Sequence, residues 1–428
     1  MSKKQIFKII IFIVAVMWLI PHITYCIRTP SDAKDRFVGF YAEKKNTIDA
    51  VVIGSSPVPY CIATPKIYGD MGITMYPLST NMQRPVAAKY LVEEALKTQD
   101  PDLFIFEMRM WQADEEGLIN DDLNQKHMGH TREVTDNMKY SLNRIRAINA
   151  MVNEDYADDA EDSENDEEDA ENDEDNAENA VSGDDGKVNE DMKRINFYFD
   201  IFKYHSNWKT LVMWSQLRTF FYEYPDDLKG FTPSDEVGPA EKGNFSNVSG
   251  VEKMPAEQEE YLADLISCLK KHNKDALFVI TPFTVSEEEQ KKINYIRDYV
   301  TERGYNFLDM NQHLDEIGFD EATDYKDGGT HVNIVGADKV TVWFEDYLSE
   351  NYVQTGKLGK HDRRHGREYN SWKKSYDLWM EELSRSEDMI RERIANGDYW
   401  KSEVNDDAEE AEDAEDGGDA EGAGGDEE

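Results

Sequence analysis

Residues 48–57, IDAVVIGSSP, decide how this chain is expected to fold. A short apolar run that ends at Gly54 is typical of a buried strand followed by a tight turn. A serine directly behind such a strand lies at the carboxyl edge of a parallel sheet, where open α/β folds bind their ligands. The stretch therefore predicts both the first strand of a parallel sheet and a polar site at its end.

Helices and strands alternate on both sides of the middle of the chain. An amphipathic helix over 87–96 leads to a second apolar strand over 102–107, and the short connections imply a parallel sheet with right-handed crossovers. The same alternation resumes late in the chain, as a helix over Ala256–His272, a strand over 276–281, a helix over 286–303, a strand over 305–310 and a helix over 336–352. We therefore expect one α/β domain in two halves, 28–150 and 193–352.

The net charge of −42 is concentrated in two tracts. Residues 151–192 contain 20 acidic residues and one lysine, and residues 403–428 contain 14 acidic residues and no base, so the tracts account for −33 of the total. Such segments cannot bury enough apolar surface to fold, and we expect a disordered insertion and a disordered tail that solvate the protein rather than bind cations or partners. The remaining chain has no basic stripe, so nucleic acid is not an expected partner.

Two aromatic-rich segments are expected to be helical. In residues 195–222, which belong to the second half of the domain, His205 and Trp208 are interpreted as packing residues rather than as a platform for a ligand ring. Residues 353–402 form an expected C-terminal extension with a long helix over 362–400. Its large residues recur at near-helical spacing and predict a packing stripe, made of Trp372, Tyr376, Trp379, Met380 and Leu383.

Residues 1–27 predict a membrane anchor. Three lysines precede the stretch 9–20, which has no charged or strongly polar side chain, and with its flanks the apolar span approaches the roughly 20 residues that cross a bilayer as a helix. The positive flank places the N-terminus in the cytoplasm. No small-residue cleavage site follows, so we favour an uncleaved signal anchor over a cleaved signal peptide. A buried core helix is disfavoured because no polar face interrupts the apolar run. The domain behind Arg28 is then expected outside the cytoplasm.

The cysteines and histidines predict no metal or cofactor site. Cys26, Cys61 and Cys268 form no CxxC pair, and no histidine cluster has metal-ligand spacing, so neither a disulfide framework nor a zinc site is indicated. Cys61 follows Ser56 closely and is a candidate thiol nucleophile. No basic neighbour in the sequence would stabilise its thiolate, however, so we give it little weight.

Ser56 and His331 stand in two loops that the expected sheet brings to one edge. Ser56 follows the first strand, where the simplest role of a serine is to cap a helix. His331 follows the last strand in a glycine-rich loop, with Asp327 four residues upstream and Asp324 further back. A serine nucleophile needs a base that accepts its proton and a carboxylate that orients the base. The pattern predicts a catalytic dyad or triad.

This combination resembles the SGNH/GDSL hydrolases. Gly54-Ser55-Ser56 is similar to the first sequence block of that family, and residues 327–337, DGGTHVNIVGA, are similar to its last. With the apolar N-terminus and residues 76–83, YPLSTNMQ, the chain more narrowly resembles the DltD-like membrane-anchored bacterial proteins. That group includes the D-alanine transfer protein of teichoic acid modification. The resemblance extends from the anchor to about residue 352, without the acidic insertion.

The resemblance implies a flavodoxin-like, three-layer α/β/α sheet, the SGNH hydrolase fold. It implies Ser56 as the nucleophile, His331 as the base and Asp327 as its partner, with Asp324 an alternative because the Asp–His spacing is one residue longer than usual. The family's oxyanion blocks are not matched in their usual form. The residues that fall near them are interpreted either as oxyanion donors or as polar groups that satisfy the sheet edge, namely Ser79, Asn81, Gln83 and Arg109.

The function implied is ester chemistry outside the cytoplasm. The expected protein is a membrane-anchored serine esterase or O-acyltransferase that acts on acyl esters of a cell-envelope polysaccharide or glycopolymer, with a polytopic membrane acyltransferase as an implied partner. The alternative is a catalytically inactive envelope assembly or glycan-binding protein that retains the fold.

Overall fold

The computed structural model describes residues 1–124, 128–152, 194–209 and 216–400. The acidic tail and all but the first two residues of the predicted acidic insertion lie outside these ranges. Those two, Met151 and Val152, are buried, so the folded part extends slightly beyond the predicted boundary.

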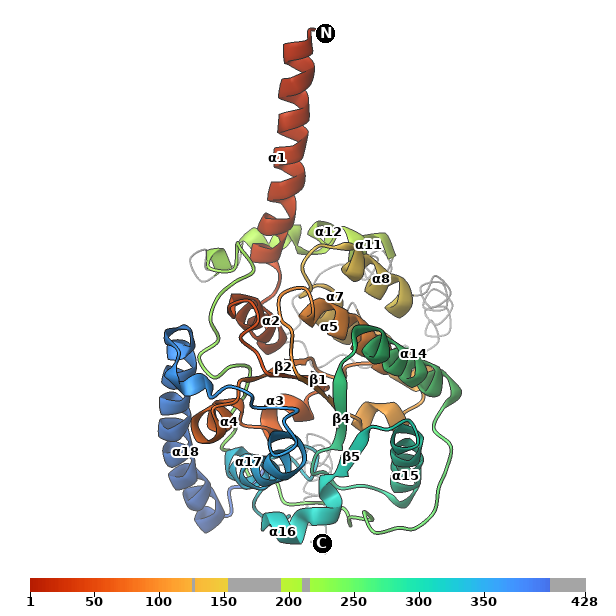
Figure 1. Cartoon of the computed structure of the whole chain (residues 1–428), viewed down its shortest axis with the longest axis vertical. Coiled ribbons are helices and arrows are strands. Elements are labelled where there is room, and N and C mark those ends of the chain that lie inside the picture. Colours follow the sequence, from red (N-terminus) through yellow and green to blue (C-terminus); the bar gives the residue numbers. More distant parts are fainter. Residues whose placement is uncertain (125–127, 153–193, 210–215, 401–428) are drawn as a thin grey trace, which may run out of the picture.

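One parallel sheet forms the core of the domain, with the strand order β2-β1-β3-β4-β5 (Figure 1). The strands are β1 (Ala50–Gly54), β2 (Met75–Ser79), β3 (Leu103–Glu107), β4 (Asp275–Ile280) and β5 (Asn306–Asp309). All four pairs of neighbours are parallel. The predicted parallel α/β sheet is confirmed, and segments far apart in the sequence contribute to it.

Strand β2 is the strand that the sequence pattern did not predict. Its sequence, MYPLS, contains Pro77, which has no N–H to donate to a ladder and is confined mostly to sheet edges. Strand β2 is an edge strand and pairs with β1 alone, with Ser79 opposite Gly54. Ser79 therefore lies beside the end of the strand that precedes Ser56.

Helices cover both faces of the sheet (Figure 1). On one face lie α2 (Asp32–Ala42), α5 (Ala88–Ala95), α14 (Ala256–His272) and α15 (Glu287–Thr301). On the other lie α4 (Thr64–Met71), α17 (Ile334–Leu348) and α18 (Asn370–Asn396). Val51 and Ile53 of β1 belong to the first core, and Ala50 and Val52 to the second. Because both of its faces are buried, the strand is a continuous apolar run.

Shorter helices complete the described chain. They are α3 (Pro57–Cys61), α6 (Glu115–Asn124), α7 (Gly129–Thr135), α8 (Leu142–Met151), α11 (Arg194–Tyr198), α12 (Ile201–Tyr204) and α16 (Leu314–Ile317). Helix α18 is shorter than the predicted 362–400. Its Trp372 and Trp379 are fully buried, as the packing stripe predicts, whereas Met380 is 45% exposed and was wrongly included in that stripe.

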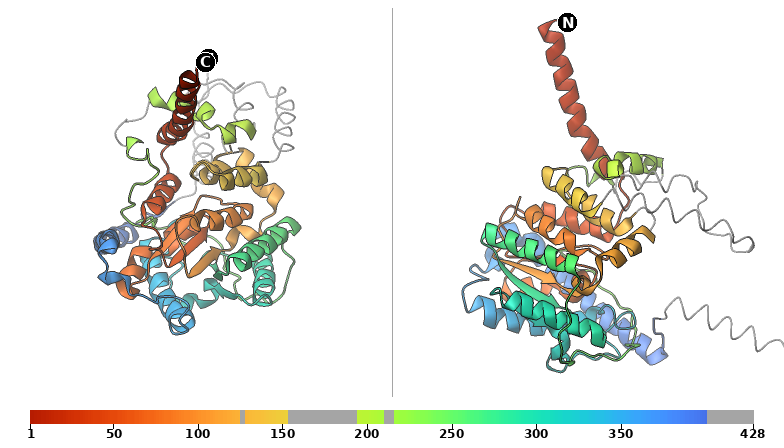
Figure 2. Two further views of the ribbon diagram at one scale, coloured as in Figure 1. Left: turned by 45° about the horizontal axis from the view of Figure 1, so that its top comes forward. Right: turned by 90° about the vertical axis from the view of Figure 1, so that its right-hand side faces the viewer.

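Helix α1 (Lys3–Ile27) stands out from the domain (Figures 1 and 2). Among the described residues it is the one helix long and apolar enough to cross a membrane. Apart from Val16, its apolar side chains from Ile6 to Ile20 are exposed, whereas Thr24, Tyr25 and Cys26 are buried against the domain. So much exposed apolar surface marks a region that contacts something other than water.

The described part of the aromatic segment 195–222 lies across the base of α1 (Figure 1). It comprises α11, α12, the 3₁₀ turn His205–Lys209 and residues 216–222. The interpretation of His205 and Trp208 as packing residues was wrong, since His205 is exposed and Trp208 is 67% exposed.

Candidate active site

Ser56 leaves the sheet at the end of β1 and stands at the N-terminus of α3. It occupies the cap position, yet its hydroxyl makes no hydrogen bond to the helix backbone. The Ser56 Oγ atom instead lies 2.8 Å from Nε2 of His331. The helix-cap role is therefore excluded in this structure, and the hydroxyl faces a base.

His331 is held by Asp327 through two contacts. Nδ1 of the ring lies 2.6 Å from Asp327 Oδ2, and the backbone N–H of His331 donates to Oδ1 at 2.7 Å. A proton on Nδ1 directed at the carboxylate leaves Nε2 as the acceptor that faces Ser56. The arrangement thus has the bond pattern of a serine, histidine and aspartate triad.

Asp324, the alternative partner, has a different role. Its side chain is buried, forms an ion pair with Lys339 at 2.6 Å and accepts the backbone N–H of Asp320 at 2.7 Å. These contacts hold the shape of the loop before His331. The structure brings Asp327, and not Asp324, to the histidine.

Two glycines accommodate the longer spacing between Asp327 and His331. Gly328 and Gly329 have φ angles of +62° and +99°, in the left-handed region that favours glycine. A Cβ on Gly329 would also lie 2.4 Å from the Thr284 side chain. The backbone therefore turns sharply enough to bring the Asp327 carboxylate to Nδ1 of His331.

Gly54 is needed because its neighbours pack closely against it, and its backbone is not in the left-handed region. A Cβ at this position would lie 2.6 Å from Cβ of Glu107 and 2.8 Å from Cγ2 of Val58. The end of β1 therefore approaches β3 and α3 more closely than any other residue would permit.

Three of the four predicted oxyanion donors are engaged within the protein or deeply buried. The backbone N–H and side-chain amide of Asn81 both donate to Glu133, at 2.8 and 3.1 Å. Gln83 is buried, with Nε2 at 3.4 Å from the Leu78 carbonyl oxygen. The Ser79 hydroxyl is buried without a hydrogen-bond partner among the described residues. The bond of Gln83 to the Leu78 carbonyl of β2 fits the alternative role, that of satisfying sheet-edge backbone, whereas Asn81 binds the side chain of Glu133 on α7.

Arg109 lies next to the histidine loop. It follows β3, and its Nη1 donates to the carbonyl of Thr330 at 2.7 Å. The guanidinium also stacks on Phe283, with 4.2 Å between the central carbon and the ring centroid. Within the described part of the chain, Nε and Nη2 are buried and have no hydrogen-bond partner. Arg109 therefore brings a positive charge to the loop that carries His331.

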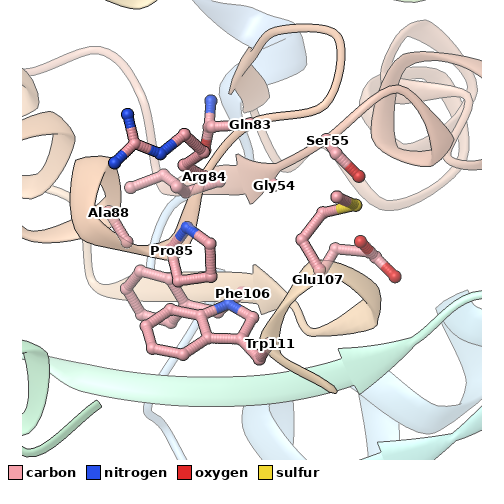
Figure 3. A pocket seen from close by; sticks show the side chains of 11 residues that line it. Gly54, Ser55, Gln83, Arg84, Pro85, Ala88, Phe106, Glu107 and Trp111 are labelled. Atoms are coloured by element: carbon pink, nitrogen blue, oxygen red, sulfur yellow. The ribbon is translucent and has the colours of Figure 1, made fainter. Parts of the chain in front are cut away.

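A small cavity lies behind the serine turn, between the ends of β1 and β3 (Figure 3). Its volume of about 10 Å³ is enough for about one water molecule. Ser55 and Glu107 lie on the same side of it, and Glu107 Oε1 accepts the backbone N–H of Arg109 at 3.1 Å. Burial raises the pKa of Glu107 to about 6, although Arg109 opposes the rise.

Glu107→Gln is expected to raise the free energy of unfolding at pH 7. The Glu107 pKa is higher in the folded protein than its ordinary value of 4.5, so the folded state retains a proton that the unfolded chain loses. Wild-type stability therefore falls as the pH rises from about 4.5 through about 6, by about 2 kcal/mol in total. Glutamine keeps an acceptor for the Arg109 N–H and cannot ionise. Urea titrations at pH 4.5 and pH 7 measure the free energy of unfolding of the wild type and of Glu107→Gln. An equal change between the two pH values in both proteins would contradict the prediction.

Two residues beside His331 were not predicted from the sequence. The Tyr60 ring lies 5.4 Å from the His331 ring, and Lys326 places Nζ 4.5 Å from the Tyr60 centroid. Tyr60 follows Ser56 by one helical turn, a spacing that could have identified it.

Cys61 is buried, and burial raises the pKa of its thiol, so its thiolate is disfavoured.

An open groove of about 350 Å³ adjoins this site. Tyr60 connects the two, because it lines the groove and contacts the His331 ring. The groove lining is mostly polar and carries charges of both signs. Its ionisable side chains, apart from Tyr60, are Asp235, Glu236, Lys326, Glu382, Arg385 and Arg393.

In the part of the chain that the structure describes, one group of side chains away from this site has metal-ligand spacing. Glu93, Cys268 and His272 place one ligand atom each within 4.8 Å of one another. However, Arg146 already binds Glu93 at 2.8 Å, and burial raises the pKa of the Cys268 thiol. We assign no role to this group.

No protein-family model, curated protein or solved structure matches this chain.

Proposed function

We propose that this protein is a membrane-anchored serine esterase or O-acyltransferase of the SGNH hydrolase type. The observation that carries the proposal is the hydrogen-bonded series from Ser56 through His331 to Asp327, with contacts of 2.8 and 2.6 Å. Ser56 Oγ would attack an ester carbonyl while Nε2 of His331 takes the hydroxyl proton and returns it to the leaving alcohol. Asp327 would stabilise the imidazolium that forms in between.

The sheet order supports a flavodoxin-like arrangement. The order 2-1-3-4-5 reverses between β1 and β3, and open α/β folds bind ligands in the crevice at such a reversal. Ser56 follows β1 and Arg109 follows β3, so the two strands at the reversal carry the nucleophile and the cation.

We assign oxyanion stabilisation in part to Arg109. The tetrahedral intermediate carries a negative oxygen, and donors already in place lower its free energy most when water is excluded. Arg109 is fixed by Thr330 and Phe283 beside the histidine loop, and it is its positive charge that would act on the oxyanion, because Nε and Nη2 are buried. The Gln83 amide would then hold the backbone of Leu78, and the Asn81 amide the carboxylate of Glu133.

The groove beside Tyr60 supports a hydroxyl-rich acyl ester as the substrate. Polar and charged side chains of both signs can bind sugar hydroxyls, and an aromatic face can pack against a sugar ring. Together with α1, this supports an acylated envelope polysaccharide or glycopolymer, handled outside the cytoplasm. Water as the acyl acceptor would make the protein an esterase. A sugar hydroxyl would make it a transferase, and a polytopic membrane acyltransferase could supply its acyl groups.

The test is turnover by the full-length protein in detergent. We expect release of acetate from a nitrophenyl ester and from an O-acetylated oligosaccharide, or its transfer to an added acceptor sugar. If the folded protein binds the acetylated oligosaccharide but turns over neither ester, the glycan-binding alternative replaces our proposal.

Tyr60→Ala is expected to raise KM for the oligosaccharide about 3- to 10-fold, because about 1 kcal/mol of ring contact is lost. The nitrophenyl ester, which has no sugar ring, should show a smaller change. Tyr224→Ala provides the control, since Tyr224 is a 42% exposed tyrosine that does not line the groove. Equal KM changes for both substrates would contradict a sugar-binding role for Tyr60.

A further inference from the structure

The described segment across the base of α1 exposes an unusual number of large apolar side chains. We call this segment, residues 194–209 and 216–222, the collar. Monomeric domains seldom expose such a cluster unless it binds a partner or a membrane. The most exposed of its side chains are Phe199 (55%), Phe202 (60%), Trp208 (67%) and Phe221 (63%).

The collar packs against the last turns of α1. The Phe220 ring lies 6.0 Å from Trp18 and 5.2 Å from His22. The Tyr222 ring lies 4.1 Å from Tyr25. The collar therefore stands at the level of the stretch from Trp18 to Tyr25 along the helix axis.

The length of α1 places that level at the membrane surface. The stretch from Ile6 to Ile23, which is mostly exposed and is apolar apart from Lys8 and His22, spans about 27 Å at about 1.5 Å per residue. The hydrocarbon core of a bilayer is about 30 Å thick. If α1 crosses the bilayer, its turns beside Phe220 and Tyr222 must lie at or inside the interfacial region, and the collar lies there with them.

An apolar pocket of about 200 Å³ opens between α1 and the collar. Apart from Gln216, its lining is apolar and comes from both elements. The residues are Ile23, Cys26, Ile27, Trp208, Leu217 and Phe220. Because the pocket lies at the level of the interface, lipid acyl chains would reach it.

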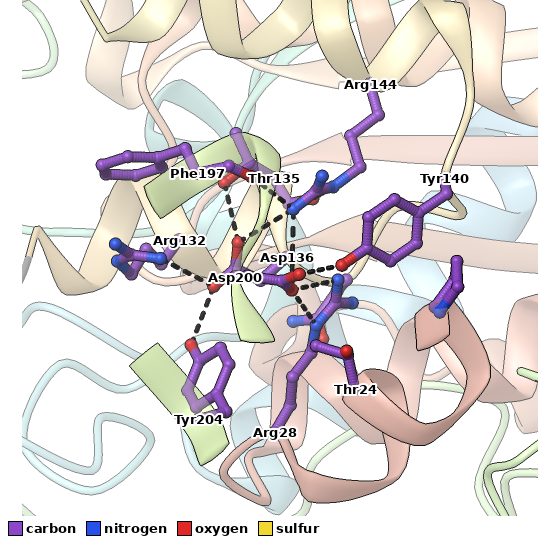
Figure 4. A network of polar contacts seen from close by, with 12 residues as sticks. Thr24, Arg28, Arg132, Thr135, Asp136, Tyr140, Arg144, Phe197, Asp200 and Tyr204 are labelled. Carbon is purple, nitrogen blue, oxygen red and sulfur yellow. Dashed lines mark hydrogen bonds and ion pairs between the residues drawn. The ribbon is translucent and has the colours of Figure 1, made fainter. Parts of the chain in front are cut away.

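Buried charges fix the collar to the domain (Figure 4). Arg28, just after α1, donates from Nε to Asp200 of the collar at 2.6 Å. Tyr204 of the collar donates to Asp136 of the domain at 2.8 Å. Arg144 of α8 lies 3.3 Å from Asp136 and donates to the collar carbonyl of Phe197 at 2.8 Å. Since breaking a buried pair costs several kcal/mol, α1, the collar and the domain are held as one body.

We propose that the collar is a membrane-interface surface, whose exposed aromatic side chains insert between the headgroups and upper acyl chains of the leaflet nearest the domain. Aromatic side chains are favoured at this depth. The domain then rests on the bilayer in one orientation instead of swinging on a flexible tether. The inference rests on α1 crossing the membrane and is independent of the chemistry at Ser56.

The test places a fluorescent thiol label at single positions of the full-length protein in phosphatidylcholine and phosphatidylglycerol vesicles. Phe202→Cys and Phe221→Cys report on the collar, and both side chains are exposed, so the labels should not disturb folding. Phe12→Cys reports on α1, and Val251→Cys, 56% exposed outside the collar, is the matched control. The three native cysteines are buried and are replaced by serine or alanine in the background.

We expect blue-shifted emission and quenching by lipids with a nitroxide near the headgroup for both collar labels, and neither effect at Val251→Cys. The Phe12→Cys label should be quenched by a nitroxide deeper in the acyl chain. Collar labels that behave like Val251→Cys while Phe12→Cys is quenched would overturn the inference and leave the anchor intact. Collar labels that are shielded only in native membranes, and not in pure lipid, would also overturn it, in favour of a protein partner.

Discussion

Replacing Ser56 by Ala is expected to lower kcat for ester turnover by about 10⁴-fold or more, because removal of a triad nucleophile leaves only binding and oxyanion stabilisation. The fold should be unaffected, since the Ser56 hydroxyl bonds to His331 and not to the helix backbone. Turnover with a nitrophenyl ester measures the loss, and circular dichroism checks the fold.

Ser55→Ala is the matched control for this variant. Ser55 is the neighbouring serine, is buried, and has a hydroxyl without a hydrogen-bond partner among the described residues. Its loss removes one oxygen from the same turn and should change kcat by less than about tenfold. Equal losses in the two variants would show that the turn matters only for structure, and full activity in Ser56→Ala would exclude Ser56 as the nucleophile.

Asp327→Asn is expected to lower kcat by about 10³- to 10⁴-fold with little change in KM. An asparagine side chain can donate to Nδ1, which favours the imidazole tautomer that carries its proton on Nε2. His331 could then no longer accept the proton of Ser56. The variant also loses the negative charge that stabilises the imidazolium. Kinetics at several pH values measure both effects.

Asp315→Asn is the control for Asp327→Asn, because Asp315 is an exposed aspartate on the short helix α16 and is not a member of the series from Ser56 through His331 to Asp327. It should retain wild-type kcat. An Asp327→Asn protein that is folded and retains wild-type kcat would mean that His331 works without an orienting carboxylate, and the triad would reduce to a dyad.

The sequence predicted the sheet wherever strands are continuous apolar runs. Strand β2 escaped prediction because Pro77 argues against a strand, and only its edge position makes the proline acceptable. The pairing of Ser56 with His331 was predictable, because parallel strands bring their carboxyl ends to one edge. The choice between Asp327 and Asp324 was not, because it depends on the left-handed backbone at Gly328 and Gly329.

Two other features depend on contacts that a linear pattern does not contain. Arg109 was one of four candidates, and only the fold shows it bound to the Thr330 carbonyl next to His331. Trp208 of the collar is a large aromatic residue, a type that usually packs in a core. In the structure it is exposed next to α1, which indicates contact with lipid instead. Apolar residues that face lipid and those that face a core have the same side chains, so the sequence does not distinguish them.

The most direct test of a nucleophilic Ser56 is labelling of the full-length protein with a fluorophosphonate probe, followed by peptide mapping of the adduct. We predict one adduct, on Ser56, that is lost in Ser56→Ala and kept in Ser55→Ala. A folded wild-type protein that stays unlabelled, or an adduct that persists in Ser56→Ala, would contradict the assignment of Ser56 as the nucleophile.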